Sequence, residues 1–178
     1  MARIDDFKAN LIGGGYRVNQ FRVTITPPPG IAIGLDVRRT SFLCKATTLP
    51  AVELQPITLK YRGRSVIIAG DRETTGTWST TFYMDTDFMI MNALQRWSNG
   101  INDFDLNTGV ASLSDYATDL TAEMIDRDDT VLKTYIFKNA WPLVVGAPPA
   151  LYSAGDNTIG EFECTWQYQN YSISGVNF

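Results

Sequence analysis

Apolar and polar side chains alternate along most of this chain, and the alternation is clearest near the C-terminus. In EFECTWQYQN (161–170), Phe162, Cys164, Trp166 and Tyr168 share one face, and polar residues take the other. This period of two is typical of a strand with one buried face. The same pattern predicts further strands, which cover 18–26, 38–47, 65–70 and 77–84.

The strand predicted at 38–47 has a defined apolar face, and two further strands are predicted on either side of residues 127–129. In RRTSFLCKAT (38–47) the apolar face of the predicted strand consists of Phe42, Cys44 and Ala46. Two further alternating segments flank Arg-Asp-Asp at 127–129, which indicates a β-hairpin. Its arms are YATDLTAEMID (116–126) and TVLKTYIFKNA (130–140).

One segment, TDFMIMNALQRWSNG (86–100), has the period of a helix. Ile90, Leu94 and Trp97 recur at helical spacing, Thr86 is placed to cap the start, and Gly100 is placed to end the helix. The polar residues 101–115 and the Pro/Gly-rich residues 141–160 are predicted to be loops.

A long extended segment, LPAVELQPITLKYRGR (49–64), carries Pro50 and Pro56. Proline cannot donate to a sheet ladder, so the segment is predicted to be an edge strand or a hairpin arm. An arm cannot bury its own apolar side chains, which favours pairing with another subunit. These side chains are Leu49, Val52, Leu54, Ile57, Leu59 and Tyr61.

The pattern therefore predicts a mainly β fold, a small β-sandwich or barrel with one flanking α-helix. At 178 residues, with 44% hydrophobic and 19% charged residues, the chain is predicted to form a single domain over 1–178. Trp78, Trp97 and Trp166 are expected in the core between sheet and helix.

Composition excludes several kinds of chemistry. The chain has no histidine, which removes Ser-His-Asp and Cys-His nucleophiles and the commonest zinc ligand. Its formal net charge of −4 argues against tight nucleic-acid binding. Cys44 and Cys164 are predicted to be buried thiols. No cofactor is indicated, and neither a signal peptide nor an apolar run long enough for a membrane helix is visible.

Acidic residues gather at three places, each with two possible roles. Asp85 and Asp87 suit a helix start, and the three aspartates of 126–129 suit a tight turn, although either group could hold a hard cation. Glu161 and Glu163 point the same way on one strand, about 7 Å apart by strand rise, which could mimic a glycosidase pair. A solvated or lumen-lining face is favoured for them.

FLCKATTLPAVELQPITLKYRGRSVIIAGDRETTGTWSTTFYMD (42–85), followed by a helix with Trp97, resembles the tail tube protein of contractile-tailed, myovirus-type bacteriophages. The order and spacing are similar over nearly the whole chain. The matching features are Cys44-Lys45-Ala46-Thr47, Leu49-Pro50, Ala69-Gly70-Asp71-Arg72, Trp78, AWPLVVG (140–146) and the last strand.

The resemblance implies a structural virion protein and not an enzyme. Six copies would close into a ring whose inner strands join in one continuous barrel, and rings would stack into a tail tube inside a contractile sheath. The implied partners are further copies of the chain and the sheath, baseplate and tail-terminator proteins. The tube would assemble in the host cytoplasm without a membrane. Residues 47–66 would form the arm that joins one ring to the next.

Double-stranded DNA would pass through the bore without specific binding. A conduit must not hold phosphates on Lys or Arg, and six copies of −4 give roughly −24 per ring. Polar strand faces are therefore expected in the lumen, although the same residues could instead face outward to the sheath. The candidates are Glu161, Glu163, Gln167 and Gln169 on the last strand and Asp119, Thr121 and Glu123 on the hairpin.

Two departures from the family pattern and two other classes of protein keep alternatives open. PPPGIAIGLDVRR (27–39) and the segment around GAPPALYSAGDN (146–157) are enlarged. They leave open a baseplate tube-initiating paralogue or a tube protein of type VI secretion or phage-like particles. The terminal aromatic Phe178 and the alternating strands also fit an outer-membrane β-barrel, and Glu161 with Glu163 fits a carboxylate-based hydrolase.

Overall fold

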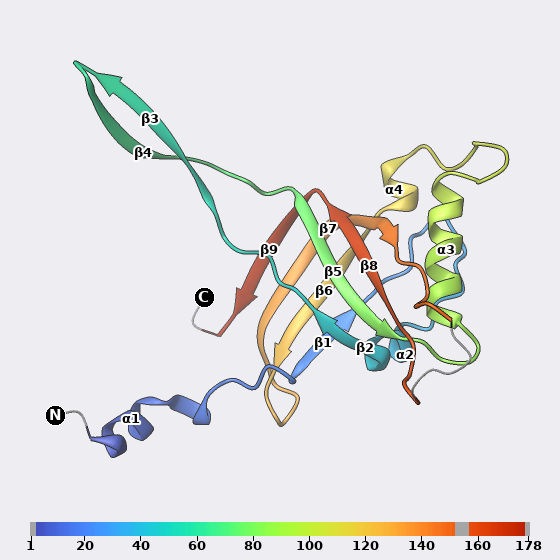
Figure 1. The fold of residues 1–178 in the computed structure, drawn as a ribbon, viewed down its shortest axis with the longest axis horizontal. Helices are drawn as coiled ribbons and strands as arrows, with labels where there is room; N and C mark the ends of the chain where they lie inside the picture. Colours follow the sequence, from blue (N-terminus) through green and yellow to red (C-terminus); the bar gives the residue numbers. More distant parts are fainter. Residues whose placement is uncertain (1–2, 152–156, 177–178) are drawn as a thin grey trace.

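The computed structural model describes residues 3–151 and 157–176. Its helices are α1 (Ile4–Asn10), α2 (Val37–Leu43), α3 (Met89–Ile101) and α4 (Leu113–Tyr116), and a 3-10 turn spans Ile12–Gly14. Its strands are β1 (Phe21–Thr24), β2 (Cys44–Thr47), β3 (Leu54–Tyr61), β4 (Arg64–Arg72), β5 (Gly76–Tyr83), β6 (Thr118–Ile125), β7 (Val131–Val145), β8 (Glu161–Tyr168) and β9 (Asn170–Gly175). The predicted mainly β fold is confirmed (Figure 1).

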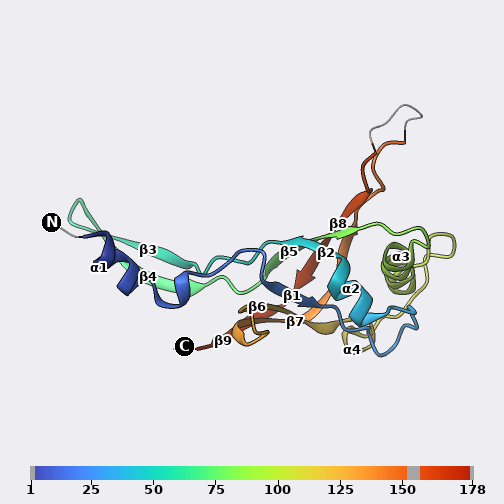
Figure 2. The same cartoon turned by 90° about the horizontal axis from the view of Figure 1, so that it is seen from below.

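Strand β7 connects two antiparallel sheets, in the order β1-β6-β7-β8-β5-β2. The N-terminal part of β7 pairs with β6 and β9, and its C-terminal part pairs with β8. We call β1, β6, β9 and the first part of β7 the β6 sheet, and β2, β5, β8 and the rest of β7 the β8 sheet. Figure 2 shows them as two layers of a sandwich, with the β3–β4 hairpin projecting from it.

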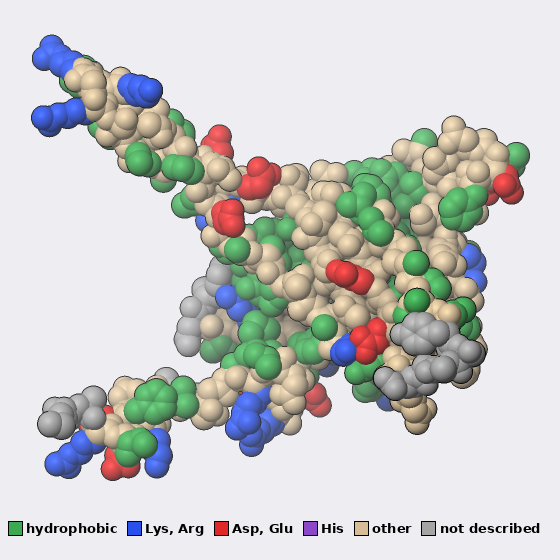
Figure 3. All heavy atoms as spheres, viewed as in Figure 1, with side chains coloured by type: hydrophobic (Ala, Val, Ile, Leu, Met, Phe, Trp, Pro, Cys, Tyr) green, Lys and Arg blue, Asp and Glu red, His purple; other side chains and the backbone are tan. Residues whose placement is uncertain are grey.

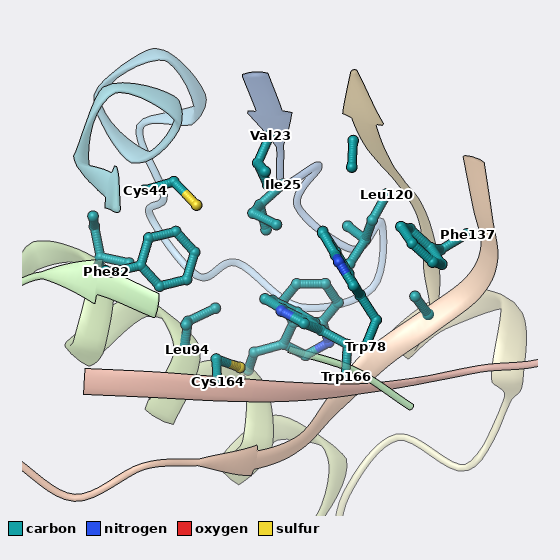
Figure 4. Close-up of a cluster of buried hydrophobic side chains, with 14 of the residues drawn as sticks. Val23, Ile25, Cys44, Trp78, Phe82, Leu94, Leu120, Phe137, Cys164 and Trp166 are labelled. Atoms are coloured by element: carbon teal, nitrogen blue, oxygen red, sulfur yellow. The ribbon is translucent and has the colours of Figure 1, made fainter. Parts of the chain in front are cut away.

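The core lies between the two sheets and is built from the inward residues of the alternating strands. Trp78 of β5 stacks on Phe137 of β7, with ring centroids 4.3 Å apart, and Trp166 of β8 lies 5.6 Å from Trp97 of α3 in an edge arrangement. Figure 4 shows Trp78, Phe137 and Trp166 converging with Val23 of β1 and Leu120 of β6. All three tryptophans are fully buried.

The predicted hairpin over 116–140 and the apolar face of 161–168 are confirmed. The first of these is β6–β7, with Leu120 opposite Phe137. On β8, Phe162, Cys164 and Trp166 are buried, and the residues between them are not.

The strand predicted over 38–47 is wrong in its first half, where the chain forms α2. The Asp36 carboxylate accepts a hydrogen bond from the Arg39 N–H at 3.1 Å, and the Thr40 hydroxyl donates to the Asp36 carbonyl at 2.7 Å. This local capping outweighs the alternating pattern. Of the predicted apolar face only Cys44 is buried, whereas Phe42 is 76% exposed.

The ends of α3 also differ from the prediction. Thr86 does not cap the helix; the Asp87 carboxylate accepts from the Met89 N–H at 3.0 Å, after Phe88 in a left-handed conformation. Gly100 does not end it, because the helix continues to Ile101. A side chain at Gly100 would meet Ile31 at 2.6 Å, so this glycine permits close packing.

Several predicted strand limits shift as well. The strand predicted at 18–26 is shorter, and β7 extends five residues into the loop predicted at 141–160. Gln169 lies between β8 and β9, where the chain turns to pair with β7. Residues 152–156 of the enlarged segment and the terminal Phe178 lie outside the described residues.

Candidate assembly interface

The β3–β4 hairpin is a two-stranded sheet that projects from the sandwich (Figure 1). It lies between β2 and β5 in the chain, so both of its ends join the β8 sheet. Arg62 and Gly63, both with positive φ, form its tight turn. Residues Tyr61 and Arg64 pair at the outer end, and Leu54 pairs with Arg72 near the body.

One face of this hairpin is apolar and uncovered. Register pairs Ile57 with Ile68 and Leu59 with Val66, and these four side chains point to the same face as Tyr61. Their exposed fractions run from 44% for Ile57 to 66% for Tyr61. The opposite face alternates with it and carries Pro56, Thr58, Lys60, Ser65, Ile67 and Ala69.

This geometry requires a partner. An isolated two-stranded hairpin is at best marginally stable in water, and large apolar patches on a surface mark sites of association. The two strands pack closely at Gly70, where an added Cβ would lie 2.6 Å from the Ile57 side chain and 2.7 Å from the Gln55 carbonyl. The hairpin is therefore a preformed strand pair with an unburied face.

Charge divides the hairpin along its length. Lys60, Arg62 and Arg64 lie at the outer end, and the guanidinium of Arg62 lies 5.3 Å from the ring of Tyr61. Glu53 and Asp71 lie near the body. Figure 3 shows the basic groups at the outer end of the arm and acidic groups toward the sandwich. A surface that binds the arm would therefore contact an apolar stripe that ends in the basic residues of the turn.

The sequence-predicted arm residues fall into two groups. Ile57, Leu59 and Tyr61 lie on the apolar face, and Val52 and Leu54 are exposed at its base. Leu49 does not belong with them, because it is partly buried against the core. Val66 and Ile68 of β4 were not predicted to belong to the arm, because SVIIAG (65–70) was predicted to be a separate strand. The apolar run of three residues in this segment was the signal that could have placed it on the arm.

The candidate lumen residues lie on two different faces. Asp119, Thr121 and Glu123 are on the outer face of the β6 sheet, whereas Glu161, Glu163 and Gln167 are on the outer face of the β8 sheet. The inner faces of the two sheets meet in the core, so their outer faces point in opposite directions. One bore cannot be lined by both sets.

The two outer faces differ in their charged groups. On the β6 sheet, Arg22 pairs with Glu123 at 2.7 Å, and Lys138 lies 3.4 Å from Asp119. On the β8 sheet, Lys45 donates to both oxygens of Glu161 at 2.6 and 2.7 Å. This hydrogen bond with Glu161 raises the pKa of Lys45.

Around these groups, the β8 face is mainly neutral and polar at its centre. Thr77, Ser79 and Thr81 of β5 lie opposite Gln167, Thr165 and Glu163 of β8. The β8 face thus carries two carboxylates and one ammonium, and the β6 face carries two of each sign.

For the two other acidic groups singled out in the sequence, Asp85 with Asp87 and the turn aspartates at 126–129, the described contacts are structural. Arg39 bridges Asp85 at 2.6 Å and Asp87 at 2.7 Å, and the hydrogen bond from Arg39 lowers the pKa of Asp87. In the β6–β7 turn, the Asp128 carboxylate accepts from the Thr130 N–H at 3.1 Å.

The described ranges contain neither a metal-binding cluster nor a membrane-spanning helix. No three metal-ligating side chains there lie together in a way that could hold a metal ion. Likewise, none of the helices in that part of the chain has the length and apolar character needed to cross a membrane.

The chain is similar to known proteins in both sequence and fold. A family model described as phage tail tube protein matches residues 16–174. A tail tube protein of Serratia phage KSP90 is 29% identical over 170 residues, which cover 94% of this chain and 95% of that protein.

Solved structures extend the likeness to the fold. The tube-terminating cap of the anti-feeding prophage has a TM-score of 0.62 at 16% identity, covering 90% of this chain and 91% of that chain. A chain from the sheath–tube complex of an extracellular contractile injection system (PVC), in its extended state, has a TM-score of 0.57 at 17% identity, covering 95% and 97%. At these identities the likeness concerns the fold alone.

Proposed function

The chain belongs to the phage tail tube protein family, and from this premise we propose that it closes into six-membered rings that its β3–β4 hairpins hold in a stack. It is a structural component of the virion tail. In this proposal the whole chain acts as one domain, without catalysis.

The uncovered apolar face of the hairpin is the observation that carries the stacking role. Its five side chains lie on a rigid strand pair far from the core of their own subunit. Because each copy has one arm, an arm that seats on a copy in the next ring makes a head-to-tail contact. Such a contact repeats without closing and gives a filament.

A pair of substitutions on neighbouring residues of β3 tests this role. Leu59→Asp places a carboxylate on the apolar face, and Thr58→Asp places the same charge on the opposite face. Burying an unpaired carboxylate in an interface costs several kcal/mol, and the cost repeats around each ring. We expect Leu59→Asp to leave folded rings that do not stack, while Thr58→Asp still forms tubes in electron micrographs. Tubes of normal length from Leu59→Asp would contradict the proposal.

The bore is assigned to the β8 face. A conduit for DNA is served by a surface with few cations, since each phosphate held by Lys or Arg adds affinity. Among the described residues, the β8 face carries two carboxylates against one cation, Lys45, and is net negative, whereas on the β6 face Arg22 and Lys138 balance Glu123 and Asp119. Glu161, Glu163 and Gln167 are therefore proposed to line the lumen, and Asp119, Thr121 and Glu123 to face outward.

The partners follow from this orientation. The outward β6 face would contact the tail sheath protein, and the open ends of the stack would meet the baseplate and tail-terminator proteins. Double-stranded DNA would pass through the bore without being held.

A further inference from the structure

Helix α1 presents an apolar face that nothing in the described chain covers. Ile4 and Phe7 are one turn apart, and Leu11 follows at the C-terminal cap, so the three share one side of the helix. Ile4 is 71% exposed and Phe7 66%, and no residue of α1 is buried. A helix of seven residues is not stable by itself in water. Within the described chain, this helix has no packing partner for its apolar face.

The helix is held away from its own sandwich. Gly13, Gly14 and Gly15 follow it, all with positive φ, and the chain then enters the body at Tyr16, whose hydroxyl donates to the Gln20 carbonyl at 2.6 Å. Figures 1 and 2 show α1 projecting from the body. The match to the family model begins at residue 16, so α1 precedes the region that the model covers.

An apolar groove lies at the seam between the two sheets, beside the point where this tether joins the body. In the described part of the chain, β1 pairs with β6 alone and β2 with β5 alone, so both edge strands are open on this side. The groove between them, which we call the seam groove, has a volume of about 260 Å³. Its apolar lining includes Phe21, Ala46, Leu49 and Met124.

We propose that α1 docks in the seam groove of a second copy of the chain, with Ile4, Phe7 and Leu11 on its apolar lining. An amphipathic helix with anchors at this spacing is the usual occupant of such a groove. Lys8, on the flank of the anchors, would lie at the charged rim of the groove, where Lys45 is present and Glu123 is already paired with Arg22, so the proposed contact is apolar and not electrostatic. The contact is head-to-tail and closes when copies form a ring.

A second copy is a better occupant than the same chain. Tyr16 and Val18 line the mouth of their own groove, so the chain leaves the groove where the tether begins. In the structure the three glycines lead α1 away from the body, so its apolar face does not lie on its own groove. A neighbouring copy in a ring would offer the same groove to the helix in this projecting position. The inference rests on the proposed ring-forming function.

Crosslinking between two differently labelled copies tests the contact. Full-length chains carrying Ile4→Cys and Ala46→Cys are mixed, assembled and treated with a short bis-maleimide. The matched control replaces Ile4→Cys with Ala9→Cys, on the opposite side of the same helix. Burial raises the thiol pKa of Cys44 and Cys164, so the native cysteines do not compete.

We expect the Ile4→Cys mixture to form heterodimers on the order of tenfold faster than the Ala9→Cys mixture, because docking raises the effective concentration of the two thiols. Equal rates in rings that assemble normally would overturn the docking and leave the proposed function intact. A crosslink confined to a single chain that carries both cysteines would overturn the second copy as occupant. A wild-type chain that stays monomeric would overturn the ring itself.

Discussion

Each buried tryptophan fills the core with a large ring and also satisfies its one polar atom. The indole N–H of Trp78 donates to the Thr47 hydroxyl at 2.7 Å, and that of Trp97 donates to the Tyr116 carbonyl at 2.7 Å. A buried indole without such a partner would carry the cost of an unpaired donor. Packing and hydrogen bonding therefore act together at these residues.

Truncation of Trp97 should destabilise the fold strongly. Trp97→Ala removes a fully buried ring that joins α3 to Trp166, and changes of this kind cost about 3–5 kcal/mol. We expect a corresponding loss in the free energy of unfolding measured with urea, which would leave a domain of ordinary stability only marginally folded. Trp141→Ala, at a partly exposed tryptophan, is the control and should cost less. Equal losses would contradict the placement of Trp97 in the core.

The two thiols should be unreactive in the folded chain. Burial raises the pKa of Cys44 to about 12 and raises that of Cys164 further. The unfolded chain ionises first, so the stability that these thiols contribute is complete below about pH 9 and is lost as the pH rises toward 12. We expect slow alkylation at pH 8 and a shallower alkaline loss of stability in Cys44→Ala. Fast alkylation without unfolding would show that the core is open.

At the scale of elements, periodicity indicates strands well where side chains alternate between core and solvent. The strand at 161–168 is predicted correctly because the side chains of Phe162 and Trp166 point into the hydrophobic core. The period misleads at 38–43, where Asp36 and Thr40 form a local cap that no alternation reveals. It also separates 65–70 from the arm, although the Arg62–Gly63 turn joins the two strands directly, because the spacing within each strand does not show which strand it pairs with.

The arm gives a prediction for proteolysis. Lys60, Arg62 and Arg64 at its outer end are exposed trypsin sites in the free subunit. We expect rapid cleavage there in unstacked rings of Leu59→Asp and protection in wild-type tubes, because the arm is covered by the next ring. Cleavage at the same rate in both samples would mean that the arm stays exposed in the tube.

At the scale of the whole molecule, the sandwich makes the two outer faces independent surfaces. A single sequence could identify polar faces at Glu161–Gln167 and at Asp119–Glu123, but it could not place them on opposite sides of one core. That separation depends on β7, which changes partner from β6 to β8 along its length. The projecting position of α1 likewise depends on the whole fold.

Matched cation substitutions on the two faces should separate bore from exterior. Thr165 and Thr121 are partly buried, outward hydroxyl residues near the middle of β8 and β6. Thr165→Lys adds six cations to the bore of a six-membered ring, so we expect normal tubes with slower DNA ejection, relieved by salt. Thr121→Lys should leave ejection unchanged and weaken sheath attachment. The reverse pattern would place the β6 face in the lumen.

Electron cryomicroscopy of tubes assembled from the purified wild-type chain tests the stacking role of the hairpin most directly. The account predicts stacked rings in which each β3–β4 arm crosses to the next ring, with Ile57, Leu59, Val66 and Ile68 buried against a subunit there. Rings whose arms lie free in solvent, or along their own ring only, would contradict it.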